Sequence, residues 1–489
     1  MKSYHFFSLR SVHCMAFAAT TLLLSACING YDEDWTFSSG VTGITLESPK
    51  AEEITFTQNP EGTRVTIEWP VVLGAGGYEF IAYNVDDANA PVQLGEAQTI
   101  DGCSVDYDIA EDTSYKFCIR SLGNAEAGNK EAETATEIAY STLVPSIATI
   151  PEGDIYAYFQ SNPIPNQDEE IAYDLVAGGN YTMSGVVDFD TQKITFRGNK
   201  VNHPKVTFGE NARFVTQAGL KIKFIDFDCN AVPKGSSDAS FILLSKTPSE
   251  AIKVASGHYV IADPIAIQSC EIRGINRHLI FDNQVKKYCV DNFLVKDCII
   301  GLNQGEVVIY LNKGGGHINN LTFENSTVYS TVQSNKRFIQ YGNDRPNKVT
   351  GFTNGSLNFR NNTFYNVSYT GDMGNYNGFG GQNTISLNLI NNIFVDCGNK
   401  QICRRLLGGR NGMVATYRYN TYWYDGAFVT GELSYDNGGL SIQTDPMLAD
   451  PANSNEMLKD FTPAGSEQLA NRTGDPRWLP EVPEGDTAE

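Results

Sequence analysis

The sequence is poor in positive charge. Its 489 residues include 36 lysines and arginines against 57 aspartates and glutamates, which gives a formal net charge of −21. A surface of this sign repels nucleic acid and anionic lipid surfaces. We therefore expect neither nucleic acid nor a charged lipid surface as a partner.

Two further patterns are missing. The eight cysteines that follow residue 27 form no Cys-x-x-Cys pair and no Cys/His cluster with zinc spacing, so we predict no structural metal. From about residue 155 onwards, no stretch of ten or more residues has the 3.6-residue periodicity of a helix. The predicted fold class is therefore all-β.

The one long apolar run lies near the N-terminus, at residues 15–24, behind two basic residues. This is the arrangement of a signal peptide, which we assign to residues 1–26. Residues 24–27, Leu-Ser-Ala-Cys, resemble the lipobox of bacterial lipoproteins. That resemblance implies cleavage before Cys27 and its lipidation, and several acyl chains hold a protein stably on a membrane. A secretory signal with a chance cysteine is the alternative.

Residues 27–40 begin with the letters CINGYDEDW, an acidic stretch directly behind the lipidation site. It resembles the surface-export signal of glycan-foraging Gram-negative bacteria, which implies an outer-membrane protein that faces the cell exterior. A solvated acidic tether is the alternative. No other apolar stretch approaches the length of a membrane-spanning helix, so the lipid is the only predicted anchor.

Residues 41–146 show short alternating strands separated by turns, as in RVTIEW (64–69) and TSYKFCIR (113–120). Trp69 closes one strand and Tyr115 lies at the start of a later one. This arrangement resembles a fibronectin type III module, which is a small β-sandwich. The resemblance implies a spacer without chemistry of its own.

The predicted second domain, residues 150–480, contains a repeat. Six segments follow one template, and their last residues are 28, 28, 36, 30 and 28 positions apart. Such a period, with one short strand per repeat, is typical of a solenoid. Because the strand is too short to return as a hairpin, successive coils must pair in parallel, which predicts a parallel β-helix. The segments are IAIQSC (265–270), FLVKDC (293–298), LTFENS (321–326), LNFRNN (357–362), LNLINN (387–392) and ATYRYN (415–420).

The two ends of this domain carry a family resemblance. YDLVAGGNYTMSGVVDFDTQKITFRGN (173–199) and the letters TDPMLADP and GDPRW within 444–478 resemble the pectin-lyase-like right-handed β-helix lipoproteins of polysaccharide-utilization systems. The resemblance implies a right-handed parallel β-helix, a glycan context and other outer-membrane glycan-uptake proteins as partners. That group includes lyases and proteins without demonstrated activity, so it leaves catalysis open.

The repeated Asn pairs predict a buried corner rather than an active site. Asparagine tolerates the left-handed conformation that a tight corner requires, and stacked amides can hydrogen-bond along the axis. Cys270 and Cys298 occupy the second position of the same corner, where a disulfide or a stack of free thiols would fit. The two predicted columns are Asn325, Asn361 and Asn391, followed by Asn362, Asn392 and Asn420.

Alternation along the template assigns one column of charged side chains to the outer face. If the protein is a uronate-specific lyase, Lys296, Arg360 and Arg418 in this column are its candidate base and enolate stabilisers. Such enzymes often add Ca²⁺, but the column offers only Glu324 as a carboxylate, and the family's calcium-binding aspartates have no match here. An ion-pair ladder between neighbouring coils is the alternative.

Aromatic residues near the C-terminal coils are candidate glycan-binding residues. Exposed tyrosine and tryptophan can cover the apolar faces of sugar rings, although the same residues could plug the end of the β-helix. The longest insertion between coils adds two arginines. The candidate set is Tyr376, Phe379, Tyr422, Trp423, Tyr424, Arg337 and Arg345.

These observations predict a lipid-anchored surface protein in which the sandwich presents a β-helix that binds polysaccharide, such as a pectin-type glycan, without cleaving it. One alternative is a polysaccharide lyase that acts by β-elimination and could use Ca²⁺. The second alternative is a structural or protein-partner role within an outer-membrane complex.

Overall fold

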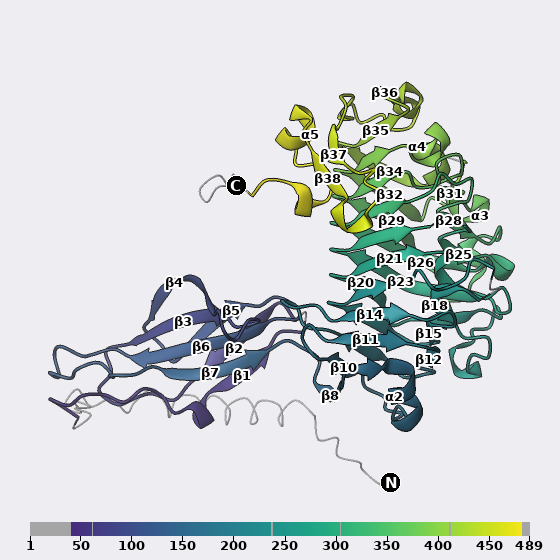
Figure 1. Cartoon of the computed structure of the whole chain (residues 1–489). Helices are drawn as coiled ribbons and strands as arrows, with labels where there is room; N and C mark the ends of the chain where they lie inside the picture. Colours follow the sequence, from purple (N-terminus) through teal and green to yellow (C-terminus); the bar gives the residue numbers. More distant parts are fainter. Residues whose placement is uncertain (1–40, 61, 236–237, 304, 410–411, 482–489) are drawn as a thin grey trace, which may run out of the picture. The chain divides into compact units, whose positions relative to one another are not determined.

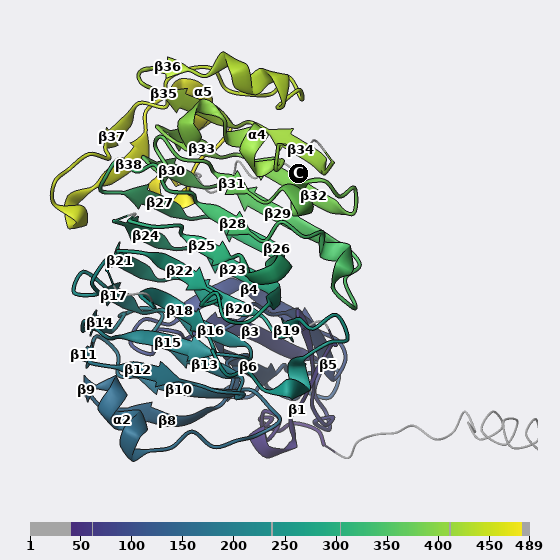
Figure 2. The same cartoon turned by 90° about the vertical axis from the view of Figure 1, so that its right-hand side faces the viewer.

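A computed structural model describes residues 41–60, 62–235, 238–303, 305–409 and 412–481 (Figures 1 and 2). The predicted signal peptide, the lipobox with Cys27 and the acidic tether lie outside these residues. The chain divides after Leu143 into two compact units, and each unit is described by itself. No helix in the described part of the chain is long and apolar enough to cross a bilayer.

The first unit is a β-sandwich of two antiparallel sheets. Alternate strand residues such as Val65, Ile67 and Phe117 are fully buried in its core, as expected when one face of each sheet is covered. One sheet has the order β1 (Thr55–Gln58), β2 (Arg64–Glu68), β5 (Ser104–Asp108), and the other has the order β4 (Val92–Ile100), β3 (Tyr78–Asn84), β6 (Ser114–Ser121), β7 (Thr136–Ser141).

The second unit is a parallel β-helix. Each complete coil contributes one strand to each of three long sheets, named sheets E, F and G here, in which successive coils pair in parallel. Figure 1 shows the coils stacked from β8 to β36 in chain order. The helices are short and lie in the connections between strands or at the ends of the coil.

The strands of the three sheets are given in chain order. Sheet E contains β8 (Ser146–Ile150), β10 (Ile171–Leu175), β13 (Ile194–Arg197), β16 (Leu220–Lys223), β20 (Ile265–Gln268), β23 (Tyr288–Lys296), β26 (His317–Glu324), β29 (Gly355–Arg360), β32 (Ile385–Ile390) and β34 (Val414–Arg418), with β19 (Tyr259–Ile261) paired to β23. Sheet F contains β9 (Gly153–Asp154), β11 (Asn180–Met183), β14 (Lys205–Phe208), β17 (Asp226–Asp228), β21 (Glu271–Ile275), β24 (Ile299–Leu302), β27 (Thr327–Ser330), β30 (Thr363–Tyr365), β33 (Ile393–Val395), β35 (Thr421–Tyr424) and β36 (Ala427–Phe428). Sheet G contains β12 (Val186–Asp188), β15 (Arg213–Thr216), β18 (Ser240–Leu244), β22 (His278–Phe281), β25 (Ile309–Leu311), β28 (Ile339–Tyr341) and β31 (Gly374–Asn375).

The expectation of one strand per repeat is wrong, because a complete coil has three. The sheet E strands β23, β26, β29 and β32 alternate between buried and less buried residues toward their C-terminal ends, which is why the template finds them. The strands of sheets F and G are short, and several are buried along their length, as in β27 and β33. A strand of three buried residues has no alternation that the sequence could reveal.

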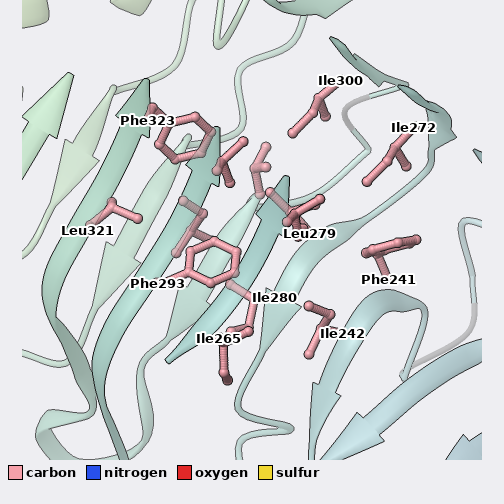
Figure 3. Close-up of a cluster of buried hydrophobic side chains, with 14 of the residues drawn as sticks. Phe241, Ile242, Ile265, Ile272, Leu279, Ile280, Phe293, Ile300, Leu321 and Phe323 are labelled. Atoms are coloured by element: carbon pink, nitrogen blue, oxygen red, sulfur yellow. The ribbon is translucent and has the colours of Figure 1, made fainter. Parts of the chain in front are cut away.

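Apolar side chains from the three sheets fill the inside of the coils. Figure 3 shows Phe293 of sheet E lying close to Leu279 and Ile280 of sheet G, with Phe323 on the coil after Phe293. Equivalent residues of successive coils stack directly, so that the rings of Phe323 and Phe359 lie 5.7 Å apart and are tilted by only 9°. Each fully buried side chain of this size contributes about 1.5–3 kcal/mol relative to exposure.

The corner between sheets E and F has two residues, and the first of them is left-handed. Asn325, Asn361 and Asn391 have φ values of 49°, 54° and 55°, which asparagine adopts more readily than most residues. Asn361 donates to Asn325 at 3.0 Å, and Asn391 donates to Asn361 at 3.1 Å. The corner position is therefore a hydrogen-bonded ladder along the axis.

The second corner position forms a ladder that is fully buried. Asn362 donates from Nδ2 to Asn392 at 2.9 Å, and Asn392 donates to Asn420 at 3.0 Å. Each amide also donates to a backbone carbonyl of a neighbouring coil, as Asn392 does to Phe359 at 2.8 Å. The Asn pairs of the repeat thus join successive coils at this corner.

Further elements close and cover the β-helix. The helix α2 (Ile155–Ser161) buries Ile155 and Phe159 against the first coils. Residues 445–480 cover part of the outer face of sheet F, where Trp478 Nε1 donates to Thr327 at 2.8 Å. The remaining elements are η1 (Ala51–Glu53), η2 (Glu250–Ile252), η3 (Lys313–Gly315), η4 (Pro346–Lys348), α3 (Asn377–Gly380), η5 (Gly398–Lys400), α4 (Ile402–Leu406), η6 (Thr430–Ser434), β37 (Leu448–Asp450), η7 (Glu456–Leu458), β38 (Asp460–Pro463), α5 (Ser466–Ala470) and η8 (Pro476–Trp478).

Candidate functional site

The charged column expected on the outer face lies on sheet E. Lys296 pairs in register with Glu324, Glu324 with Arg360, Arg360 with Ile390, and Ile390 with Arg418. Arg360 and Arg418 are exposed, and the other three are half-buried, whereas the residues next to them in each strand are buried. The structure therefore brings the three proposed cations onto one strip.

The ion-pair ladder that offered an alternative for this strip does not form. Within the described part of the chain, the side chains of Lys296, Glu324, Arg360 and Arg418 make no ion pair within 4.0 Å. Their charges are open to solvent and to a ligand.

The two corner cysteines are free thiols, so the disulfide that the sequence left open is absent. Each thiol instead faces backbone carbonyls. Cys270 donates to Gln268 O at 3.2 Å, and Cys298 donates to Lys296 O at 3.1 Å. Both are fully buried, and burial raises the pKa of the Cys298 thiol to about 12. These thiols take the place of the asparagines in the buried ladder.

Three of the aromatic candidates are core residues, so their assignment to an exposed glycan site is wrong. Tyr376 and Tyr422 are 0% exposed and Phe379 is 1% exposed. The hydroxyl of Tyr376 donates to Leu406 O at 2.8 Å, and that of Tyr422 donates to Asp436 at 2.8 Å. These rings lie inside the last coils and shield the core from water. Their burial fits the alternative that they plug the end of the β-helix.

The other two aromatics of that set differ from each other. Tyr424 is 5% exposed, stacks on Tyr369 with ring centroids 5.0 Å apart, and donates to Tyr369 O at 3.1 Å. Trp423 is half-buried and lies on the outer face of sheet F beside Phe428. Tyr424 is therefore also buried, and only Trp423 of the pair is partly exposed.

The two arginine candidates flank strand β28 of sheet G, next to residues that the sequence did not single out. Arg337 lies two residues before β28, and on the outer face of sheet G an aligned row of side chains crosses four strands. Phe281 pairs with Tyr310, Tyr310 with Gln340, and Gln340 with Asn375. The rings of Phe281 and Tyr310 are stacked at 5.5 Å and tilted by 11°. The row thus joins a half-buried aromatic ring to two amides.

Arg337 is held in place over this row. Its Nη1 donates to Gln340 Oε1 at 3.0 Å. The Asn375 amide, with its oxygen turned toward the guanidinium, accepts from Nε at 2.9 Å and from Nη2 at 3.1 Å. The side chain nevertheless stays 40% exposed. A fixed and partly exposed guanidinium is suited to binding a carboxylate or a sugar hydroxyl.

Positive charge exceeds negative charge near the starts of the last four strands of sheet G, β22, β25, β28 and β31. Four cationic side chains share two carboxylates there, although the chain as a whole has a net charge of −21. This edge therefore attracts an anion that most of the surface repels. The pairs are Arg337 and Arg405 with Asp372, at 3.9 and 3.0 Å, and Arg277 and Lys336 with Glu306, at 3.9 and 3.6 Å.

A polar hollow lies at the other end of the same strands. It has a volume of about 630 Å³ and is lined by Asn343 and Arg345 after β28 and by Asn377, Gly378 and Gly381 after β31. Arg345 is exposed, and no ion pair involves it among the described residues. The two predicted arginines therefore lie at opposite ends of the same strand, β28, with Gln340 between them.

His278 in β22 and Asp282 directly after it have strongly shifted pKa values, but neither can reach a ligand. Burial lowers the pKa of His278 to about 4 and raises that of Asp282 to about 6, and both are almost completely buried. Asp282 accepts from Lys313 N at 2.9 Å and from Gln284 N at 3.1 Å, so its role is to fix the turn after β22. The described residues contain no group of three or more His, Cys, Asp or Glu arranged to hold a metal ion.

Sequence reasoning missed Tyr310, Gln340 and Asn375 because it did not recognise the strands of sheet G. A signal is present in hindsight. The same short pattern occurs three times: a residue that points outward, a residue that points inward, and an Asn one or two positions later. The three segments are IYLN (309–312), IQYGN (339–343) and GNYN (374–377). The signal is weak because each strand has only two or three residues.

Three family models match successive stretches of the chain. Each describes a domain of unknown function: DUF4992 matches residues 1–178, DUF4957 matches residues 179–331, and DUF5123 matches residues 357–478. No curated protein matches the chain in sequence.

Among solved structures, two of the PL6 family alginate lyase AlyGC, one of them a mutant, are 12% identical to this chain. The mutant covers 67% of this chain with a TM-score of 0.36, and the other covers 76% with a TM-score of 0.30. The chain spans 45% of the length of either structure. Pectate lyase PelI from Erwinia chrysanthemi, in complex with tetragalacturonic acid, is 9% identical, with a TM-score of 0.14 and coverage of 62% of this chain and 87% of its own. These values are too low to carry an activity or a substrate over to this chain.

Proposed function

We propose that the β-helix binds an acidic polysaccharide across the outer face of sheet G and does not cleave it. The observation that carries this proposal is the partly exposed guanidinium of Arg337, which Gln340 and Asn375 hold at a fixed position. It lies at the N-terminal ends of the strands, where positive charge exceeds negative charge. Guanidinium groups bind carboxylates through paired hydrogen bonds, which suits the uronate units of an acidic glycan.

The side chains next to Arg337 are suited to binding the uncharged parts of a sugar chain, in addition to its acidic groups. Tyr310 offers a flat ring for the apolar face of a sugar, and the amides of Gln340 and Asn375 offer donors and acceptors for hydroxyl groups. The polar hollow with Arg345 extends this surface beyond the ends of β28 and β31. A chain of several sugar units fits such an extended surface better than a single small molecule does.

Binding without cleavage is favoured by the state of the acid and base groups. His278 and Asp282, whose pKa values are strongly shifted, are closed off from solvent. A general base must reach the proton that it removes, and neither side chain can. A lipid anchor at Cys27 and an exposed location remain part of the proposal, with capture of glycan at the cell surface as the biological role.

The test uses the chain without residues 1–27 and a panel of acidic and neutral polysaccharides. Affinity electrophoresis in gels that contain each glycan measures retention, and ultraviolet absorbance detects the unsaturated uronate ends that β-elimination creates. We expect retention by an acidic glycan, no new absorbance with or without Ca²⁺, and a loss of about tenfold in affinity for Arg337→Gln, which corresponds to about 1.4 kcal/mol.

Arg64→Gln is the matched control, because Arg64 is an exposed arginine of the first unit. It should leave retention unchanged. New absorbance would overturn the non-catalytic role in favour of a lyase. Retention by no glycan would favour the structural or protein-partner role, and equal losses in both variants would show that total charge rather than Arg337 determines binding.

A further inference from the structure

The charged strip on sheet E has a regular spacing of its own. Along the column that contains Lys296, Arg360 and Arg418, a cation occurs at every second coil, and Glu324 and Ile390 occupy the coils between. Neighbouring strands lie about 4.8 Å apart, so successive cations of this strip are about 10 Å apart along the axis. The in-register pairing makes this spacing a fixed property of the fold.

The three cations are free of partners inside the described protein, as shown above, and two of them are exposed. In contrast, Arg197 at the N-terminal end of the same column is 7% exposed in its side chain and is paired with Asp174 at 2.7 Å. The positive charge of this column is therefore neutralised at Arg197 and remains unpaired at Lys296, Arg360 and Arg418. These three unpaired cations form a local positive strip on a chain whose net charge is −21.

The neighbouring column on the same face is polar and ordered. Asn358 donates to Thr322 at 3.3 Å, and Asn388 donates to Asn358 at 2.7 Å. These side chains are half-buried, so they form a fixed floor beside the cations. Amides and hydroxyls in a row offer hydrogen bonds to the hydroxyl groups of a sugar chain.

We propose that the outer face of sheet E between Lys296 and Arg418 is a second binding surface, which takes a linear acidic polysaccharide lying along the axis of the β-helix. In an extended glycan in which alternate rings turn opposite sides to the protein, the acidic groups on one side recur at every second ring. A protein face with a cation at every second coil matches that arrangement. Ile390 supplies an apolar contact between two cations, and Glu324 accepts a hydroxyl hydrogen bond between the other two.

The occupant follows from the charge spacing. Double-stranded DNA carries about one negative charge per 1.7 Å of its axis, and three cations spaced about 10 Å apart match it poorly. This inference goes beyond the proposed site on sheet G, because it concerns different side chains on a different sheet.

The decisive experiment changes the spacing and leaves the charge unchanged. The double variant Arg360→Gln, Ile390→Arg keeps three cations on the strip but places them three coils and one coil apart. Each of Lys296→Gln, Arg360→Gln and Arg418→Gln should weaken retention by polygalacturonate, alginate or a sulfated glycosaminoglycan about threefold to fivefold, as exposed ion pairs do. The double variant should lose as much affinity as Arg360→Gln alone.

Measurements in the Arg337→Gln background separate the two surfaces. The losses should persist there, because they do not depend on sheet G, whereas Lys205→Gln on the exposed part of sheet F should have no effect. Unfolding midpoints should stay at the wild-type value, since these side chains make no ion pair with the described protein. Wild-type retention of the double variant, or equal retention of all variants, would overturn the proposal, as would tighter binding of single-stranded DNA than of any glycan.

Discussion

Asn362 donates a hydrogen bond from Nδ2 to Oδ1 of Asn392 at 2.9 Å, although 30 positions separate the two residues in the chain. The same Asn392 oxygen accepts from the backbone N of Asn362 at 3.1 Å. One buried amide therefore joins two coils through a side chain and a main chain at once. This relationship is the physical meaning of the repeated Asn pair.

Replacement of Asn392 by Ala should destabilise the β-helix strongly. The substitution leaves the N–H and the Nδ2 of Asn362 without their acceptor and the carbonyl of Phe359 without its donor. A buried group without a partner costs about 1–3 kcal/mol, so we expect a loss of about 3 kcal/mol or more in the free energy of unfolding. Urea-induced unfolding followed by circular dichroism measures it.

Asn388→Ala is the matched control, because Asn388 lies in the strand three residues before Asn391 and is half-buried. Its Nδ2 donates only to Asn358, and water can replace that bond. We expect a loss below about 1 kcal/mol. Equal losses for the two variants would contradict the special role of the buried corner.

The aromatic residues of the last coils are expected to contribute to stability rather than to binding. Phe379 is 1% exposed and packs against Tyr341 and Tyr376 with ring centroids 5.3 and 5.6 Å apart. Phe379→Ala should lower the free energy of unfolding by about 3–5 kcal/mol. Glycan retention should be unchanged at temperatures where the variant is folded.

Trp423→Ala provides the comparison, since Trp423 is only half-buried. It should cost less stability than Phe379→Ala and should also leave retention unchanged, because it lies on sheet F, away from both proposed surfaces. A loss of retention in Trp423→Ala without a loss of stability would restore the aromatic residues as a glycan site.

The sequence predicts the parts of this fold that repeat in long alternating strands. The columns of sheet E and both Asn columns follow from one template, because a period of two residues shows which side of a strand faces inward. The strands of sheets F and G remained hidden, since they have only two to five residues and several, such as β27 and β33, are buried throughout. The sequence therefore located the corner correctly but not the face on which Arg337 lies.

Exposure was the second quantity that the sequence could not provide. Tyr376 and Tyr422 are of a residue type that suits a sugar-binding surface, yet both are fully buried. A tyrosine in a short strand can point inward or outward, and only the register of the coil decides which. The same register placed Lys296, Arg360 and Arg418 correctly, because their strands are long enough to show alternation.

The C-terminal segment over sheet F should depend on pH through Asp475. Burial raises the pKa of this carboxyl to about 6, although Arg477 lies beside it and Thr327 donates to it at 2.8 Å. The folded protein therefore binds a proton more readily than the unfolded chain. Stability from this group is present at low pH and is lost as pH rises from about 4 to about 6, at a cost of up to about 3 kcal/mol.

Asp475→Asn isolates that contribution, because an amide can keep the bonds to Thr327 and to the N–H of Arg477 without a charge. The variant should be more stable than wild type at pH 7 and closest to it near pH 4. His278 and His317 have lowered pKa values and act in the opposite sense, so only the difference between variant and wild type is diagnostic. A difference that does not change with pH would contradict the assignment.

Lysine at position 337 tests whether geometry or charge matters at the proposed site. Lys keeps the positive charge but lacks the planar fork that engages Gln340 and Asn375 together. We therefore expect Arg337→Lys to weaken retention by an acidic glycan about threefold to fivefold, less than the tenfold loss for Arg337→Gln. The salt dependence of retention should be the same for Arg337→Lys as for wild type and weaker for Arg337→Gln, because only the latter loses a charge. If Arg337→Lys binds like wild type, the held guanidinium is not the feature that recognises the glycan.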